Sequence, residues 1–489
     1  MCPRLLGSVV ALLACLATAT TRAQEAVRQP RNVLLLFADD LRRDALGVRP
    51  EGPSVTPNLD GLAARGTRLT RVACMGSRHG AVCMPSRAML MSGRGLTHVT
   101  DDLKDAETLP ERLRAHGLRT FMTGKWHNGR PALTRAFPDA GSVFLGGMCD
   151  HFHVPLHDVV AGKIVKPRTG GAHSSELFAD AAIAFLEAQA GGEAPFFAYV
   201  AFTAPHDPRD PPPRWLGALH QRELPPLPAN FRGQHGLDLG RATMTVRDEN
   251  LLGWPRDPDL LRQQLAEYRA LVAHLDEQVG RILDALARSG RADETLVVFA
   301  ADHGLALGSH GLLGKQSLYE HSMGAPVIVA GPGVSRSASR SGLAYLFDLP
   351  TTICAAVGAA APAGSDGIDL GPLLRGEGPS REVLFTLYAG EQRALRDDRY
   401  KLLRLPSIDR TLLFDLQDDP DELHDLSGDA DHAEVLAAMA ARLRAEQERW
   451  GDALPWTAAE LRAPTIDLTG HPRKPDQWQP AWIVDKYFR

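Results

Sequence analysis

Long apolar runs recur along the chain, and several of them end abruptly in charged residues. Residues 32–40, NVLLLFADD, are apolar up to a pair of aspartates, and residues 295–304, TLVVFAADHG, are apolar up to Asp302 and His303. A strand of a parallel sheet is covered on both faces, so it forms a continuous apolar run instead of an alternating one. We therefore predict buried strands at both places, and further strands at 118–127, 195–207 and 325–333.

Helical periodicity separates these strands. In residues 261–286, apolar side chains recur in steps of three and four, which predicts an amphipathic helix. Residues 108–117 predict a shorter helix that ends at Gly117. Alternating helices and apolar strands are typical of an α/β protein, so the predicted fold has a large, mostly parallel central sheet flanked by helices.

The pattern changes after about residue 376. Residues 383–427 alternate short strand-like segments with turn residues, residues 432–450 read as a helix, and the segment after them is rich in proline and tryptophan. We predict a main domain at 28–375. Residues 376–489 are predicted to form a smaller C-terminal subdomain, made of an antiparallel sheet and a helix, and an irregular tail that wraps around the protein.

The first residues have the layout of an export signal. Residues 1–23 combine Arg4, an apolar run and small residues, as a secretory signal peptide does. The letters LLAC, ending at Cys15, allow a second interpretation, a bacterial lipoprotein site that would leave a lipid anchor. No other segment is long and apolar enough to span a membrane. We expect an exported protein, periplasmic or secreted, that contacts a membrane only if it is lipid-anchored at Cys15.

Charge narrows the range of partners. The 489 residues include 54 basic and 59 acidic side chains, which gives a formal net charge of -5. This balance argues against nucleic acid or an anionic membrane as the main partner.

Polar residues follow four of the predicted strands, where ligands of parallel sheets bind. They are Asp39 and Asp40, Lys125 and His127, His206, and Asp302 and His303. A single case can arise by chance, but the four together indicate one shared site. Adjacent carboxylates are unfavourable unless a cation neutralises them, and oxygen ligands favour Ca²⁺ or Mg²⁺ over zinc. The alternative is that Asp40 and Asp302 only cap the turns that follow them.

A cysteine begins another predicted element. Residues 83–94, CMPSRAMLMSGR, predict a helix because Pro85 suits a first turn and Gly93 suits a C-terminal end. Cys83 would occupy the helix N-terminus, where unpaired N–H groups favour an anion, and Arg87 would lie one turn away. Two interpretations stay open on these grounds: a buried structural cysteine and a thiolate nucleophile.

A family resemblance adds a third interpretation. CMPSR resembles the Cys-x-Pro-x-Arg signature of the type I sulfatases, in the alkaline phosphatase-like superfamily. Further segments resemble motifs of this family in the same order; they are RNVLLLFADDLRRDALG, MTGKWHNG, ADHGLALGSHGLLGKQSLYEHS and LLFDLQDDPDELHDLS. The resemblance extends from about residue 31 to residue 427 and covers most of the chain.

The resemblance implies a role for each matching residue. A formylglycine-generating maturation enzyme would oxidise Cys83 to formylglycine, the nucleophile of the family. The metal, Ca²⁺ or Mg²⁺, would be bound by Asp39, Asp40, Asp302, His303 and the modified Cys83. The residues around the aldehyde hydrate and the sulfate ester would be Arg87, Lys125, His127, His206 and Lys315. Either His206 or Lys315 would protonate the leaving oxygen, and His127 would assist the later release of sulfate.

The predicted function is hydrolysis of a sulfate monoester, and resemblance to polysaccharide-degrading members favours a carbohydrate substrate. One alternative is a phosphate or phosphonate ester hydrolase of the same superfamily. Another is a non-catalytic protein that binds sulfated glycans. Residues 146–158, GGMCDHFHVPLHD, are predicted to form a polar surface loop, with a sugar subsite or a second metal site as alternatives. Glu320 and His321 are further candidates for the pocket wall.

Overall fold

A computed structural model describes residues 29–47, 54–220, 224–378 and 380–489. The predicted signal peptide at 1–23 and the lipoprotein site at Cys15 lie outside the described residues. Among the residues described, no helix has both the length and the apolar character needed to cross a membrane.

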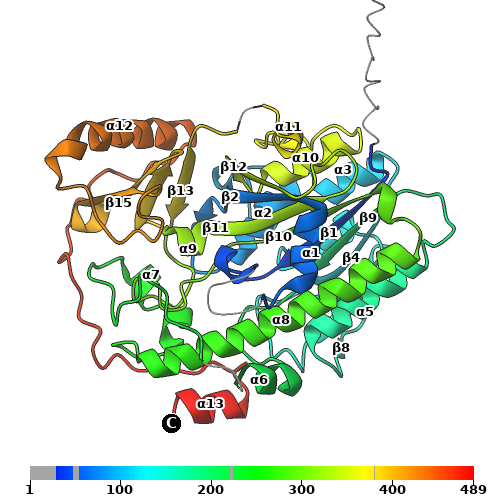
Figure 1. Cartoon of the computed structure of the whole chain (residues 1–489), viewed down its shortest axis with the longest axis horizontal. Coiled ribbons are helices and arrows are strands. Elements are labelled where there is room, and N and C mark those ends of the chain that lie inside the picture. The colour runs from blue at the N-terminus through cyan, green and yellow to red at the C-terminus, as the bar shows by residue number, and fades with distance from the viewer. Residues whose placement is uncertain (1–28, 48–53, 221–223, 379) are drawn as a thin grey trace, which may run out of the picture.

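A large sheet crosses the molecule in the order β12-β2-β11-β10-β1-β9-β4-β5-β6-β7, and β8 pairs with β6 (Figure 1). Its centre is parallel, because β10, β1, β9, β4 and β5 are consecutive neighbours that run the same way. These five strands span Thr295–Ala301, Asn32–Ala38, Phe196–Ala201, Arg119–Lys125 and Ala140–Phe144. The others are β2 (Gly66–Ala73), β6 (Pro155–Val160), β7 (Lys163–Ile164), β8 (Arg168–Thr169), β11 (Gly324–Ala330) and β12 (Ala338–Tyr345). The predicted α/β class is confirmed.

The strand predicted at 325–333 is present as β11, but it runs antiparallel to both β10 and β2. The chain that leaves β10 at Ala301 stays at the same edge of the sheet and re-enters it at Gly324. The following strand must therefore run back in the opposite direction. The sheet is parallel through its centre and mixed toward its edges.

Each face of the sheet buries its own core. Alternate residues of β1 point to opposite sides, so Leu35 belongs to one apolar cluster and Leu36 to the other, as the two-residue period of a strand requires. One core is covered by α2 (Cys83–Ser92), α3 (Leu109–Ala115) and α10 (Asp348–Ala356). The other is covered by α1 (Pro57–Arg65), α5 (Ser174–Glu187) and α8 (Pro258–Arg288). The apolar stripe of α8 is buried over its whole length, which confirms the helix predicted at 261–286.

The main part of the chain also contains several short helices. They are α4 (Arg130–Ala136), α6 (Pro213–His220), α7 (Arg241–Met244), α9 (Glu320–Met323) and α11 (Gly371–Arg375).

A second sheet has the order β16-β15-β14-β13-β3, and α12 (Ala433–Arg449) packs on it. Its strands from the C-terminal part are β13 (Leu384–Tyr388), β14 (Gln392–Arg396), β15 (Tyr400–Leu405) and β16 (Arg410–Asp415), all antiparallel. Strand β3 (Gly76–Ser77) comes from the main part of the chain and pairs with β13 in parallel. The small sheet is thereby joined to the segment just before Cys83. The predicted boundary at residue 376 stays a prediction.

Beyond α12 the chain continues as an extended tail. In Figure 1 this orange-to-red segment leaves the small sheet, runs along the main part of the molecule and ends in α13 (Ala481–Tyr487), next to α6 and α8. The wrapping tail expected from the sequence is therefore present.

Gly124 allows a close approach between two of the central strands. It precedes Lys125 in β4, its φ is +95°, and a β-carbon there would lie 1.8 Å from the carbonyl oxygen of Ala201 in β9. Gly124→Ala should therefore lower the free energy of unfolding by clearly more than the ~1–3 kcal/mol that a positive φ alone costs a residue with a side chain. Urea denaturation followed by circular dichroism measures this loss.

Gly117→Ala is the matched control. Its φ is +101°, yet a β-carbon at this position would have no atom within 4 Å from any described residue other than its two chain neighbours. Equal losses at the two positions would contradict the prediction, because only the substitution at Gly124 brings a side chain against a neighbouring backbone.

Candidate active site

The four strands whose ends carry the predicted polar residues are immediate neighbours, in the order β10-β1-β9-β4. All three pairings among them are parallel. The segments that follow their C-terminal ends therefore meet at one edge of the sheet. This arrangement brings together the residues that were predicted to share a site: the aspartates, Lys125, His127, His206 and His303.

Two overlapping groups of buried side chains have the spacing of metal ligands. Asp39, Cys83 and Asp302 form one, and Asp40, Asp302 and His303 form the other; within each, the potential ligand atoms lie within 4.8 Å of one another. The backbone N–H of Asp40 donates to Asp302 Oδ1 at 3.0 Å, which binds the ends of β1 and β10 together. The residues predicted to bind the metal are thus close in space.

Several atoms of this cluster are buried without a hydrogen-bond partner among the described residues; they are Asp39 Oδ1, Asp302 Oδ2 and His303 Nε2. Burial and the charge of Asp39 hold the pKa of Asp302 well above its usual value, although His303 acts in the opposite direction. Unpaired buried acceptors and crowded carboxylates are what a hard cation stabilises. The donor set therefore fits a divalent metal ion.

Two buried cations balance part of this negative charge. Lys125 Nζ lies 2.5 Å from Asp39 Oδ2 and 3.5 Å from Cys83 Sγ. Arg87 Nη2 lies 3.4 Å from Asp39 Oδ1 and 3.7 Å from Asp302 Oδ2. Burial alone would raise the pKa of Asp39, but Lys125 and Arg87 lower it well below its usual value. Asp39 is therefore held as a carboxylate.

Helix α2 places Cys83 at this edge of the sheet. The helix begins at Cys83 and ends before Gly93, whose φ of 70° provides a left-handed cap. The Ser86 hydroxyl donates to the carbonyl of Asp302 at 2.8 Å, and Asn128 Nδ2 donates to the carbonyl of Met84 at 2.8 Å. The first turn of α2 is therefore fastened both to the end of β10 and to the segment after β4.

The surroundings of Cys83 favour a negative charge. Burial raises the pKa of its thiol, but Lys125, Lys315 and His127 together lower it well below the usual value. His127 Nδ1 lies 3.5 Å from Cys83 Sγ. An inert structural cysteine is normally buried in apolar surroundings, so the structural interpretation of Cys83 does not fit this site.

Lys315 and His206 approach Asp40 from other segments. Lys315 Nζ donates to both carboxylate oxygens of Asp40 at 2.9 Å. His206 Nε2 lies 3.7 Å from Asp40 Oδ2, and its Nδ1 donates to the carbonyl of Asp207 at 2.8 Å. The residues predicted to surround the sulfate ester thus lie around the acidic cluster.

Two of the site residues have strained backbones. Asp40 has φ of 64° and His127 has φ of 70°, in the left-handed region that side chains disfavour. Such strain costs about 1–3 kcal/mol per residue and is found mainly at functional sites. It is consistent with selection for chemistry at these two positions.

A polar network beside the site was missed by the sequence analysis. Arg247 Nη1 donates to Asp207 Oδ1 at 2.7 Å and to Asp248 Oδ1 at 2.9 Å. Asp248 Oδ2 in turn accepts from Gln316, the neighbour of Lys315, at 2.8 Å. The adjacency of Asp207 to His206 was visible in the sequence, but residues 247 and 248 lie in a segment with no periodic pattern.

The structure revises two other expectations. His151, in the loop predicted to be exposed, is buried, and its Nε2 lies 3.0 Å from the carbonyl of His206. Glu320 forms ion pairs with Arg43 and Lys401, both at 3.2 Å, so its carboxylate joins β15 to the main part of the chain. Because Glu320 is committed to these cations, it serves packing and not the pocket wall.

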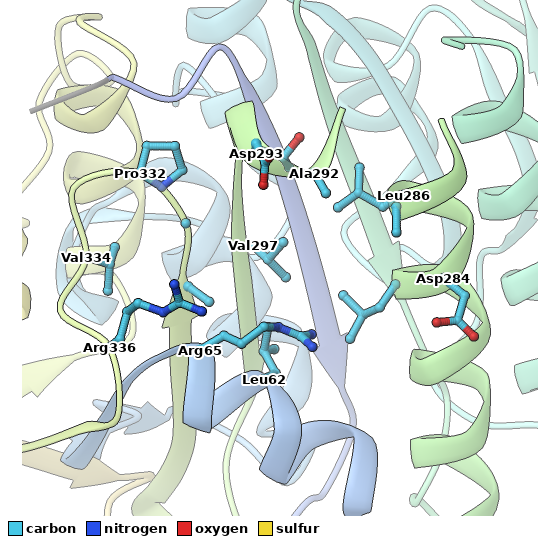
Figure 2. Close-up of a pocket in the computed structure, with 15 residues that line it drawn as sticks. Leu62, Arg65, Asp284, Leu286, Ala292, Asp293, Val297, Pro332, Val334 and Arg336 are labelled. Carbon is cyan, nitrogen blue, oxygen red and sulfur yellow. The ribbon is translucent and has the colours of Figure 1, made fainter. Parts of the chain in front are cut away.

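A cavity of about 520 Å³ lies at the other end of the central strands (Figure 2). It is lined by Thr295 and Val297 at the start of β10, by the end of α8, and by Arg65 and Arg336. The catalytic candidates follow the opposite end of β10, so this cavity is separate from the site.

Comparisons with known proteins agree with the geometry. The family model described as Sulfatase matches residues 31–359, and the model described as N-sulphoglucosamine sulphohydrolase, C-terminal, matches residues 308–449. An N-acetylglucosamine-6-O-sulfatase of Bacteroides thetaiotaomicron is 25% identical, over 89% of this chain and 89% of that protein. Arylsulfatase A of Homo sapiens is 31% identical, over 85% of this chain and 87% of that protein.

A solved structure shares the fold. It is a protein in complex with its substrate D-glucosamine-2-N,6-O-disulfate, with a TM-score of 0.72, 22% identity, and coverage of 88% of this chain and 99% of that one. The match of the Sulfatase model to most of the chain, together with these relatives, shows that the protein belongs to the sulfatase family of the alkaline phosphatase-like superfamily and is a sulfuric ester hydrolase.

Proposed function

We propose that the protein is an exported, divalent-metal-dependent sulfatase that removes sulfate from carbohydrate sulfate monoesters, with formylglycine derived from Cys83 as its nucleophile. One observation carries the proposal: Cys83 Sγ lies beside Lys125, His127 and the buried carboxylates, at the edge where four parallel strands end. Export rests on the predicted signal at 1–23, as a secreted or periplasmic form or as a lipoprotein through Cys15.

The ligands proposed for the metal are Asp39, Asp40, Asp302, His303 and residue 83. Oxygen atoms dominate this set, which favours Ca²⁺ or Mg²⁺ over a transition metal. When bound, the ion supplies a positive charge that polarises a sulfate oxygen. Asp39 Oδ1 and Asp302 Oδ2, which accept no hydrogen bond among the described residues, support this assignment.

Oxidation of Cys83 by a maturation enzyme would supply a hydrated aldehyde, which offers one oxygen for attack on sulfur and a second for the later release of sulfate. Around that position, Arg87 and Lys125 supply fixed positive charge, and each is itself held by Asp39. His127 lies beside residue 83 and is placed to take up a proton there. Preorganised charges of this kind stabilise the transition state without reorganisation.

The leaving oxygen needs a proton because a sugar alkoxide is a poor leaving group. Lys315 Nζ already donates to both oxygens of Asp40. His206 Nε2, by contrast, lies 3.7 Å from the same carboxylate, beyond hydrogen-bond distance. We assign the proton donor to His206 and a sulfate-binding charge to Lys315.

The carbohydrate substrate is supported by the relatives. The matched sulfatase of Bacteroides thetaiotaomicron is named for an amino sugar 6-O-sulfate, and the structural neighbour holds a disulfated glucosamine. The rival activities are hydrolysis of phosphate or phosphonate esters and binding of sulfated glycans without turnover. These activities can be distinguished with three substrates: glucosamine 6-sulfate, 4-nitrophenyl sulfate and 4-nitrophenyl phosphate.

Protein produced with a maturation enzyme should contain formylglycine at position 83. Mass spectrometry of the tryptic peptide His79–Arg87 should show the thiol sulfur replaced by an aldehyde oxygen. This protein should release sulfate from the sulfate esters much faster than it releases phosphate from the aryl phosphate, and Cys83→Ala should lose at least about 10³-fold in kcat because the nucleophile is absent.

Each rival has its own result. Faster turnover of the aryl phosphate would favour a phosphohydrolase. Binding of the sulfated sugar by the matured protein, with no sulfate released, would favour a non-catalytic role. Activity that survives in Cys83→Ala would refute the proposed nucleophile.

Metal binding should be measurable without turnover. Adding Ca²⁺ to EDTA-treated protein should raise its melting temperature, because a ligand at ~100 times its dissociation constant stabilises the folded state by about 2.7 kcal/mol. Asp302→Asn should largely abolish this rise, whereas Cys83→Ala should retain most of it because four proposed ligands remain. Differential scanning calorimetry with Ca²⁺ and then Mg²⁺ also identifies the preferred ion.

Asp180→Asn is a suitable control. Asp180 lies on α5 with a side chain that is 59% exposed, and its carboxylate pairs with Arg281 at 2.7 Å, so its loss should leave the Ca²⁺ effect intact. The metal assignment would be contradicted if neither ion raised the melting temperature of the wild-type protein, or if Ca²⁺ raised that of Asp302→Asn as much as that of the wild type.

A further inference from the structure

The last part of the chain lies outside both matched family regions, which end at residues 359 and 449. Within it, residues 470–489, here called the strap, include α13 and return to the main part of the molecule beside α8 (Figure 1). The strap packs next to the active site, and its side chains join the polar network there.

The strap contacts the residue that follows His206. Gln479 Nε2 donates to Asp207 Oδ2 at 3.0 Å. Asp476 Oδ2 accepts from Arg247 Nε at 2.6 Å, while Arg247 Nη1 donates to Asp207 Oδ1 at 2.7 Å. Arg247 also pairs with Asp207 Oδ2 through Nη2, so it holds both carboxylate oxygens. The strap therefore acts on Asp207 in two ways: Gln479 bonds one oxygen directly, and Asp476 holds the arginine that binds both.

Asp207 in turn orients the proposed proton donor. Its carbonyl accepts from His206 Nδ1 at 2.8 Å, and its carboxylate oxygen Oδ1 lies 3.5 Å from the same nitrogen. This arrangement leaves Nε2 directed toward Asp40, at 3.7 Å. A shift of Asp207 would therefore turn or displace the imidazole at the reacting end.

These ion pairs are shielded from water. The side chains of Asp207, Asp476 and Arg247 are 7%, 18% and 28% exposed. Charged hydrogen bonds are stronger in such surroundings than at the surface, and losing one partner leaves the other poorly compensated. Removing the strap's side chains would therefore leave buried charge beside Asp207 poorly compensated.

Separate contacts attach the strap to the protein. Lys486 Nζ and the Tyr487 hydroxyl both donate to Glu267 Oε1 on α8 at 2.7 Å. Trp482 Nε1 donates to Asp210 Oδ1 at 2.9 Å. Because these anchors do not involve Asp207, the strap can remain docked when Asp476 or Gln479 is changed.

We propose that the strap is a positioning element of the active site, in which Asp476 and Gln479 fix Asp207 and thereby the imidazole of His206. This inference rests on the proposed function, because it assigns the strap to the proton donor of sulfate ester cleavage. When the bond between sulfur and the leaving oxygen breaks, the electron pair stays on that oxygen and His206 Nε2 gives it a proton. Asp476 and Gln479 touch neither reacting atom and act only through Asp207.

The test compares two leaving groups. A nitrophenolate leaves readily without being protonated, whereas the more basic unsubstituted phenolate depends more strongly on a proton donor. Loss of a positioned acid should therefore slow hydrolysis of phenyl sulfate more than hydrolysis of 4-nitrophenyl sulfate. In the matured enzyme, Asp476→Ala combined with Gln479→Ala should lower kcat on phenyl sulfate at least about 10-fold and kcat on 4-nitrophenyl sulfate less than about 3-fold. KM should change little, and Asp476→Glu alone should retain most of the wild-type ratio.

Tyr487→Phe is the matched control, because it removes a strap hydrogen bond to α8 that does not involve Asp207. It should keep the wild-type ratio of the two rates. Equal losses on both substrates in the double variant, or the same ratio change in Tyr487→Phe, would overturn the positioning role and leave a general structural one.

A crystal structure of the double variant gives a result that does not depend on turnover. The His206 ring should lose its contact with the carbonyl of Asp207 while α13 stays docked on α8; an unchanged ring would overturn the inference. If the wild-type enzyme hydrolyses neither aryl sulfate nor glucosamine 6-sulfate, the proposed function fails, and the crystal structure still tests whether the strap positions His206.

Discussion

The structure depends on the burial of three carboxylates at one point. Asp39, Asp40 and Asp302 are almost completely excluded from solvent, where unpaired negative charge is strongly unfavourable. The surrounding chain compensates in steps: Lys125 and Arg87 lie against Asp39, Lys315 binds Asp40, and a divalent cation fits the acceptors that remain. The same positive charge that makes this cluster tolerable is what an anionic sulfate ester requires.

The fold makes this concentration of charge possible. Four adjacent parallel strands bring their C-terminal ends to one edge of the sheet. Two apolar cores, one on each face of the sheet, hold those strands in place. Helix α2 is fastened to the end of β10 by Ser86, and β3, just before it, is a strand of the smaller sheet. The C-terminal sheet therefore directly supports the segment that leads into Cys83.

Polar networks beyond the reacting groups extend this support. Glu320 joins the small sheet to the main part of the chain through Arg43 and Lys401. Arg247 connects Asp207, Asp248 and the strap, and so reaches the neighbours of both His206 and Lys315. Each network replaces solvent around a buried charge with fixed partners, which keeps the site rigid.

The sequence alone determined the α/β class, the central strands, the long helix α8 and the residues of the candidate site. These features follow from local patterns: continuous apolar runs, a helical stripe, and polar residues placed at strand ends or within the CMPSR motif. Only the tertiary structure showed that β11 runs antiparallel, that His151 and Glu320 are committed to packing, and that Arg247, Asp476 and Gln479 surround Asp207. The physical reason is separation along the chain: Asp207 and Gln479 stand 272 residues apart, and no local pattern records which distant side chain will neutralise a buried charge.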